Sequence, residues 1–439
     1  MSNKINSISN FKRTSKSSTL LKHFLILAFC CITAVRSYSQ ETNSPYSFLG
    51  IGEVYNGGTS INTMSGGLGV ASSNGLYINT LNPAMLVRNR YTVFEMGVNT
   101  EFKSMQNTAQ RSNTYSGTIS PIFLALPASP KWTLALGLAP YSTVDYKTVA
   151  SRKSNILGTD SITYTYSGNG GLNKAIVSNG FKLGKNMAIG LESSLIFGVI
   201  NRNVVTQNFN DAQRYQVTLA NRTNYSGLHF KLGYAWRPKI GKDYFLNFGA
   251  TAEVAQNLGT KSFRSFNIYD ASGITLVNAD TLEQSSSSLK LPANYKVGVS
   301  LEKTGKLLVS LDYSLTKWSG FTNISGSSDN LKDAHTIAIG AEFIPQFDAI
   351  SGYFNHVMYR AGANYTQSPY SLNNGEPAKD MSFSVGVSLP LRTISYINIG
   401  FVRGKRGVLA TNGLEEVYNK VVVGFSLGDF YWFRKPKID

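Results

Sequence analysis

Hydrophobic and polar residues alternate with a period of two along most of the chain from about residue 91. This is the period of a β-strand, whose successive side chains point to opposite faces. The clearest example has Leu307, Val309, Leu311 and Tyr313 on one face and Ser310, Asp312 and Ser314 on the other. Strands of this kind form either a sandwich, in which the apolar faces make the core, or a barrel whose apolar face meets lipid.

The lengths of the strands and of their links distinguish these two folds. The pattern predicts about fourteen strands, near residues 91–105, 114–128, 132–149, 171–184, 187–206, 223–237, 243–262, 286–303, 306–319, 334–346, 357–368, 380–390, 393–403 and 415–429. Nearly all reach the roughly 9–11 residues that a membrane-crossing strand needs, whereas sandwich strands average about 5–6. Short links, as at 184–186, alternate with long ones, as at 263–285, although the link near 347–356 is longer than this alternation explains. The predicted fold is therefore all-β, a transmembrane antiparallel β-barrel.

The first residues have the features of a secretory signal. A basic lead precedes an apolar stretch at 24–35, and small residues follow at 37–39. We expect residues 1–39 to be a signal peptide. Both cysteines, Cys30 and Cys31, lie within it, so the mature chain is expected to lack disulfides and zinc–cysteine sites. Phe29 stands before them, where a lipoprotein signal would need a small residue.

Composition agrees with a β-rich membrane protein. Charged residues make up 15% of the chain, against about 25% in a typical soluble domain. The six basic residues of the leader account for part of the formal net charge of +17, which falls to +11 without them. The remaining excess is spread over turns and loops and does not interleave with aromatic residues, so we expect no nucleic-acid binding.

Residues 40–89 differ from the rest, being dense in Gly, Asn and Ser and lacking a long strand. We expect this segment to form an N-terminal hatch inside the lumen, with a disordered periplasmic tail as the alternative. The predicted barrel then covers residues 90–433, and residues 434–439 form a short periplasmic tail. An even number of strands places both termini on the periplasmic side.

Several motifs resemble the FadL family of outer-membrane transporters for hydrophobic compounds. Gly66, Gly67 and Gly69, followed by Asn82-Pro83-Ala84, resemble the family's small-residue stretch and its Asn-Pro-Ala motif before the first barrel strand. Residues 291–299, 311–319, 360–369 and 384–387 are similar to its later strands. The resemblance implies a fourteen-stranded barrel plugged by an N-terminal hatch. Some members of the family serve secretion or attachment instead, so the fold leaves the cargo open.

The sequence shows no catalytic or metal-binding constellation. His229, His335 and His356 are far apart in the strand order, and no nucleophile-elbow, P-loop or metalloprotease motif occurs. We therefore expect no enzyme, cofactor or metal. Asp333 lies near His335, but a histidine at a loop end is more often simply solvated.

Five charged residues fall on the small or polar face of predicted strands and are candidate lumen contacts: Lys296, Glu302, Asp312, Glu342 and Arg360. They either pair with one another, or Lys296 or Arg360 meets an acidic head group. Trp132, Trp318 and the aromatic residues 431–433 are expected at the membrane interfaces.

These patterns favour an outer-membrane channel for the passive uptake of hydrophobic small molecules such as long-chain fatty acids, gated by the hatch. The alternative is a structural or protein-secretion-associated barrel whose loops or lumen bind partner proteins. The expected partners are outer-membrane lipid, a hydrophobic ligand and, for the alternative, other outer-membrane proteins of a Gram-negative bacterium. In either case Val385→Arg on the lipid face should destabilise the barrel more than Ser384→Arg on the lumen face.

Overall fold

The computed structural model describes residues 44–55, 58–153, 161–208, 215–270, 272–278, 283–347, 352–371, 376–392 and 394–429. The predicted signal peptide at 1–39, the aromatic residues 431–433 and the predicted tail at 434–439 lie outside the described residues. All statements below concern the described part of the chain.

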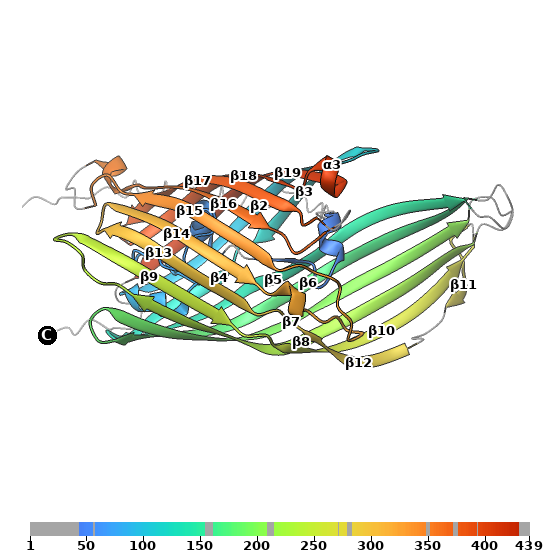
Figure 1. Ribbon diagram of the computed structural model, residues 1–439, viewed down its shortest axis with the longest axis horizontal. Helices are drawn as coiled ribbons and strands as arrows, with labels where there is room; N and C mark the ends of the chain where they lie inside the picture. Colours follow the sequence, from blue (N-terminus) through green and yellow to red (C-terminus); the bar gives the residue numbers. More distant parts are fainter. Residues whose placement is uncertain are drawn as a thin grey trace, which may run out of the picture. The chain divides into compact units, whose positions relative to one another are not determined.

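Strands make up nearly all of the structure (Figure 1). They are β1 (Glu53–Val54), β2 (Thr92–Asn107), β3 (Arg111–Ile119), β4 (Ile122–Ser129), β5 (Trp132–Lys153), β6 (Ser161–Leu183), β7 (Met187–Asn208), β8 (Gln216–Trp236), β9 (Tyr244–Glu253), β10 (Asn257–Tyr269), β11 (Thr275–Asn278), β12 (Glu283–Lys290), β13 (Asn294–Lys303), β14 (Leu307–Thr316), β15 (Ala334–Phe343), β16 (Met358–Gln367), β17 (Lys379–Arg392), β18 (Ser395–Arg406) and β19 (Leu414–Asp429).

The helices are few and short. They are η1 (Pro45–Phe48), α2 (Ser60–Met64), η2 (Pro83–Arg88), η3 (Trp318–Gly320), η4 (Tyr353–His356) and α3 (Leu409–Asn412). Among the described residues, no helix has the length and apolar character needed to cross a membrane. The long link near 347–356 contains η4, which accounts for part of its extra length.

The strands close into an antiparallel barrel with a wall of 14 strands. Three wall strands consist of two segments each, namely β3 with β4, β9 with β10, and β12 with β13, and the last strand β19 pairs with the first strand β2 along its full length. Most predicted strands match the observed ones, but β6 and β8 begin about ten and seven residues earlier than predicted, and β10, β11 and β12 extend into the predicted long link at 263–285. β1 and β11 are additions, because β1 pairs with the edge of β5 and β11 is a short hairpin partner of β10.

The two faces of the wall are arranged as the alternation predicts. Val309 and Leu311 are exposed on the outside, whereas Ser310 and Asp312 between them are buried on the inside. The same division holds on β17, where Val385 is 40% exposed and Ser384 is 1% exposed. The outer surface is thus an apolar band and the inner surface is small or polar.

The buried core lies between the inner face of the wall and the chain that precedes β2. We call this chain, the described residues of 44–89, the N-terminal segment. Each of the five hydrophobic clusters contains at least one of its residues, such as Tyr46, Ile61 or Leu86. Among the described residues, each of these clusters therefore joins side chains of the wall to side chains of the N-terminal segment.

One prediction about the aromatic residues is wrong. Trp132 is 39% exposed, in agreement with an interfacial position, but Trp318 is only 5% exposed. Its ring packs against Phe321 and Tyr370 in the largest hydrophobic cluster. Trp318 lies in η3, just after β14 ends, where the strand alternation that placed it outside no longer applies.

Candidate functional site

The N-terminal segment is folded by local contacts of its polar residues. Thr59 and Asn62 form a capping box at the start of helix α2, in which the side chain of each bonds to the backbone N–H of the other. Pro83 occupies the first turn of η2, where its missing N–H costs nothing, and the Asn82 side chain accepts a hydrogen bond from the Ala84 N–H at 3.0 Å. The Asn-Pro-Ala motif is thus the start of a short helix.

Two asparagines connect the segment to itself and to the wall. The Asn82 amide donates to the Val70 carbonyl at 2.8 Å and to the Tyr234 carbonyl on β8 at 3.0 Å. Asn79 donates to the carbonyls of Gly69 and Ser72. These bonds satisfy backbone groups that an irregular buried segment would otherwise leave without partners.

The glycines of the segment allow a close approach between backbones. Gly66 has φ of +76°, and a Cβ there would lie 2.9 Å from the Ala363 nitrogen on β16. A Cβ at Gly69 would lie 2.7 Å from both the Asn62 amide nitrogen and the Leu81 side chain. Gly67, with φ of +84°, has open space at the Cβ position, so glycine is favoured there by the backbone conformation and not by a close neighbour.

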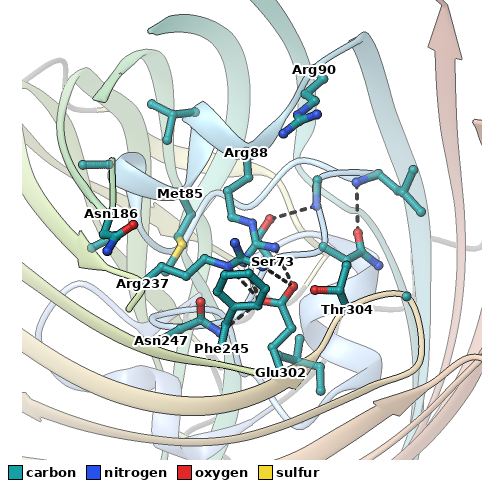
Figure 2. A pocket seen from close by; sticks show the side chains of 18 of the residues that line it. Ser73, Met85, Arg88, Arg90, Asn186, Arg237, Phe245, Asn247, Glu302 and Thr304 are labelled. Atoms are coloured by element: carbon teal, nitrogen blue, oxygen red, sulfur yellow. Dashed lines mark hydrogen bonds and ion pairs between the residues drawn. The ribbon is translucent and has the colours of Figure 1, made fainter. Parts of the chain in front are cut away.

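Glu302 on β13 is the centre of the strongest ionic contact between segment and wall (Figure 2). Its carboxylate accepts two hydrogen bonds from Arg88 of η2, at 2.8 and 2.9 Å. It accepts two more from Arg237, at 2.9 and 3.1 Å, and one from Asn247 at 3.1 Å. Arg237 also lies 3.5 Å above the ring of Phe245. Glu302 is therefore neutralised by two forked guanidinium groups, one from each side of the contact.

Arg88→Gln is expected to loosen the segment without unfolding the barrel. Glu302 keeps Arg237, so the loss is that of hydrogen bonds to a charged group, about 1.5–3 kcal/mol. Hydrogen exchange of the amides in η2 should become faster while exchange in the wall strands stays unchanged. Arg90→Gln is the matched control, because Arg90 lines the same cavity but is exposed and points away from Glu302. Equal exchange in both variants would contradict this role of Arg88.

Two more of the predicted charged residues also contact the segment. Asp312 accepts hydrogen bonds from the backbone N–H groups of Gly69 and Val70, both at 2.9 Å. Glu342 accepts from Asn74 of the segment at 2.6 Å and is paired with Arg360 at 2.7 Å. Arg360 is thus already paired inside the wall.

Lys296 is placed differently from the other four. It lines two cavities, of about 80 and 390 Å³, and faces a group of charged residues on β6 to β9. In that group Lys231 bridges Glu192 at 3.1 Å and Glu253 at 3.9 Å. The structure therefore brings Glu302, Asp312, Glu342 and Arg360 against or beside the N-terminal segment, and Lys296 against open space.

Sequence reasoning missed a second ionic group, at the long-loop end of the interior. Arg406 pairs with Glu53 of the segment, with Asp380 at 3.1 Å and with Glu416 at 3.6 Å. Burial would raise the pKa of Glu53, but the attraction of Arg406 and Lys103 outweighs burial and lowers it. The stabilisation from Glu53 is therefore present above its ordinary pKa and is lost as the pH falls through the lowered value. Glu53 and Arg406 are 353 residues apart, so no local pattern connects them.

Parts of the lumen face are covered by the N-terminal segment and do not meet water. This corrects the expectation that Ser384→Arg is a mild substitution. The Ser384 hydroxyl donates to the carbonyl oxygens of Met64 at 2.9 Å and Gly362 at 3.2 Å. An arginine at this position would collide with the segment, so Ser384→Arg is not the milder change that the alternation alone suggests. Thr366 on β16 is half-buried and lines the 390 Å³ cavity, and it is a better lumen-facing comparison.

Cavities lie on both sides of the segment. One of about 630 Å³ is lined by η2 and by the short links near Lys185 and Gly305. Another, of about 550 Å³, is lined by Phe48, Leu289 and Phe321 together with polar residues at the long-loop end. The segment contributes residues to the lining of both. Within the described residues, no group of His, Cys, Asp and Glu is arranged to hold a metal ion.

Together these features define a closed fourteen-strand β-barrel whose wall residues pack against the N-terminal segment. A family model described as BamG matches residues 20–439. The chain belongs to the BamG family. No curated protein matches the sequence.

Solved structures of hydrocarbon channels and transporters share this fold. The toluene transporter TbuX of Ralstonia pickettii is 15% identical, with a TM-score of 0.56, over 85% of this chain and 98% of that one. The CymD monoaromatic hydrocarbon channel is 13% identical, with a TM-score of 0.55 and the same coverage. A FadL homologue of Pseudomonas aeruginosa is 13% identical, with a TM-score of 0.52, over 85% and 97%. The predicted resemblance to the FadL family is confirmed at the level of the fold.

Proposed function

We propose that this protein is an outer-membrane channel of a Gram-negative bacterium that admits hydrophobic small molecules, and that its N-terminal segment is the hatch. The observation that carries the proposal is the position of the segment between a cavity at the long-loop end and a cavity at the short-link end. The apolar band on the outside of the barrel supports membrane insertion. The toluene and monoaromatic hydrocarbon channels with the same fold support a hydrophobic cargo.

The long-loop cavity has the character of an entry site for an amphipathic ligand. Phe48 supplies exposed apolar surface, while Arg202 and Arg264 lie on the lining together with Glu283, which pairs with Arg264 at 3.4 Å. A cavity of about 550 Å³ is within the usual range for a small-molecule site. A long-chain fatty acid offers both an apolar tail and an anionic head group, and we propose that class as the substrate.

Passage requires the contacts between the hatch and the wall to rearrange. The bond from Asn82 to the Tyr234 carbonyl and the bond from the Gly69 N–H to Asp312 both join the segment to the wall, so a shift of the segment has to break them. The C-terminal end of the barrel is then periplasmic, because β19 ends at Asp429 beside Thr92, at the same end as the short links. Uptake of a radiolabelled long-chain fatty acid by intact cells tests this proposal.

A second candidate is a structural or secretion-associated barrel that binds partner proteins. The specific observation in its favour is the forked pair of hydrogen bonds from Arg88 of the segment to Glu302 of the wall, which anchors the segment more firmly than a freely moving gate requires. In that case the segment only seals and stabilises the barrel. A variant that loses fatty-acid uptake while its complex with partner proteins stays intact would favour the channel over this alternative.

A further inference from the structure

Strand β3 has a partner on one side only. Its residues pair with β2, from Val98↔Ile119 to Gln106↔Arg111. In the described part of the chain no strand pairs with its other edge, because β5 pairs with β4 only as far as Leu138. Beyond that point β3 and β5 are separate, and the wall has a seam.

Two prolines account for the seam. Pro121 ends β3, and Pro140 lies at a register shift in β5. Neither has a backbone N–H, so the ladder that joins β4 to β5 cannot continue past them. On the long-loop side of these prolines, β3 is paired with β2 alone.

The chain covers one side of the seam with its own N-terminal segment. β1 pairs with the β5 edge at Glu53↔Thr143, and the Tyr55 N–H donates to the Tyr141 carbonyl at 2.9 Å. The Ser44 N–H donates to the Asp145 carbonyl at 2.9 Å. The β5 edge is therefore satisfied by added strand-like backbone, while the facing edge of β3 is not.

The register identifies which backbone groups of β3 face the seam. The Asn107 N–H donates to the Gln110 carbonyl at one end of the β2–β3 pair, and the Ser120 N–H donates to the Gly97 carbonyl at the other. Because hydrogen-bonded pairs alternate in an antiparallel ladder, the even-numbered residues of β3 bond to β2. The groups that point into the seam belong to Arg111, Asn113, Tyr115, Gly117 and Ile119.

This edge is open to other molecules. None of the nine residues of β3 is buried, and Ile119 is 65% exposed. A Cβ at Gly117 would meet nothing within 4 Å. The outward side chains of β3 change from apolar at Ile119 to charged at Arg111. Tyr115 lies between them, with its ring 4.8 Å from that of Phe102. This gradient places β3 at the membrane interface, where unpaired backbone groups are costly.

We propose that the free edge of β3 binds an extended segment of another polypeptide by β-strand addition. Unpaired backbone donors and acceptors in strand geometry are best satisfied by a second strand, as the β5 edge of the same seam shows. The proposal goes beyond uptake of small molecules and assumes only the membrane-inserted barrel.

A second copy of this chain cannot supply that strand. Strands of such barrels tilt by about 35–45°, and two copies in one membrane are related by rotation about its normal. This rotation would cross the two β3 strands steeply, and no ladder forms between crossed strands. The occupant is therefore a tail or loop of a different protein that is free to lie along β3.

Hydrogen exchange resolved to single amides tests the proposal without any substitution. The amides of Asn113, Tyr115 and Gly117 should exchange more slowly in native outer-membrane vesicles than in the detergent-purified barrel, by about tenfold or more. The amides of Thr114 and Ser116, which face β2, should be protected in both preparations. Equally fast exchange of the seam-facing amides in both preparations would overturn the proposal.

A photo-crosslinking amino acid at Gly117 identifies the occupant. We expect an adduct with another polypeptide that disappears with Asn113→Pro and persists with Asn113→Ala, because only proline removes the N–H. Heat-modifiable gel migration shows that both variants are folded. An adduct of two copies, an adduct with lipid alone, or one that survives Asn113→Pro would each contradict strand addition. Fatty-acid uptake should be the same in both variants, so this proposal and the channel proposal can fail separately.

Discussion

Deleting residues 41–89 is expected to make liposomes that carry the barrel permeable to small polar solutes. The segment contributes residues to the lining of the 630 Å³ cavity and of the one at the long-loop end, and its removal should join them into one water-filled lumen. Barrels with only a few more strands already hold an aqueous channel, so efflux of a trapped sugar should rise on the order of tenfold or more. Selectivity for apolar solutes should be lost at the same time.

The deletion needs a folded barrel to be interpreted. The largest hydrophobic cluster contains Tyr46 and Ile51, so the deletion also removes part of the core. Heat-modifiable migration on a denaturing gel reports whether the barrel closes. Arg88→Gln is the graded control, because the segment is weakened but still present, and its efflux should lie near that of the wild type. Unchanged permeability of a folded deletion variant would contradict a plugging role.

Val385→Arg is expected to destabilise the barrel by about 2–4 kcal/mol, the cost of arginine on the lipid face near the bilayer midplane. Val385 lies near the middle of β17 and is exposed on the outside. Its neighbours across the ladder are Ala361 and Phe401, which are also exposed. The free energy of unfolding in lipid vesicles with urea or guanidinium measures the effect.

Thr366→Arg is the matched comparison for that measurement. Its side chain points into the 390 Å³ cavity, where an arginine can reach water or the carboxylates that line the same space. We expect it to cost much less than Val385→Arg. A similar loss of stability in the two variants would mean that the apolar face does not meet lipid.

The course of the wall could be predicted from the sequence because each strand carries its own signal. Alternation depends on neighbours along the chain, so strands such as Leu307–Thr316 were predicted within a few residues of their observed bounds. The links, short at one end and long at the other, indicated a barrel rather than a sandwich. The sides of Val309 and Ser310 follow from the same period.

The contents of the barrel could not be predicted in this way. Arg88 and Glu302 are 214 residues apart, and only the closure of the wall brings them together. Ser384 has the pattern of a solvated lumen residue, but Met64 covers it. The seam depends on Pro121, between β3 and β4, and on Pro140 in β5, and their effect is visible only once the register is known. Long-range contacts of this kind leave no periodic trace in a single sequence.

The most direct test of the central claim is uptake of a radiolabelled long-chain fatty acid by intact Gram-negative cells that lack their own channel for it. An intact outer membrane excludes such molecules, so the assay reports the channel itself. The account predicts uptake when this chain is expressed, and reduced uptake when Phe48→Asp places a charge in the long-loop cavity. The result that would contradict it is uptake no greater than that of cells without the chain, although the folded barrel is present in their outer membrane.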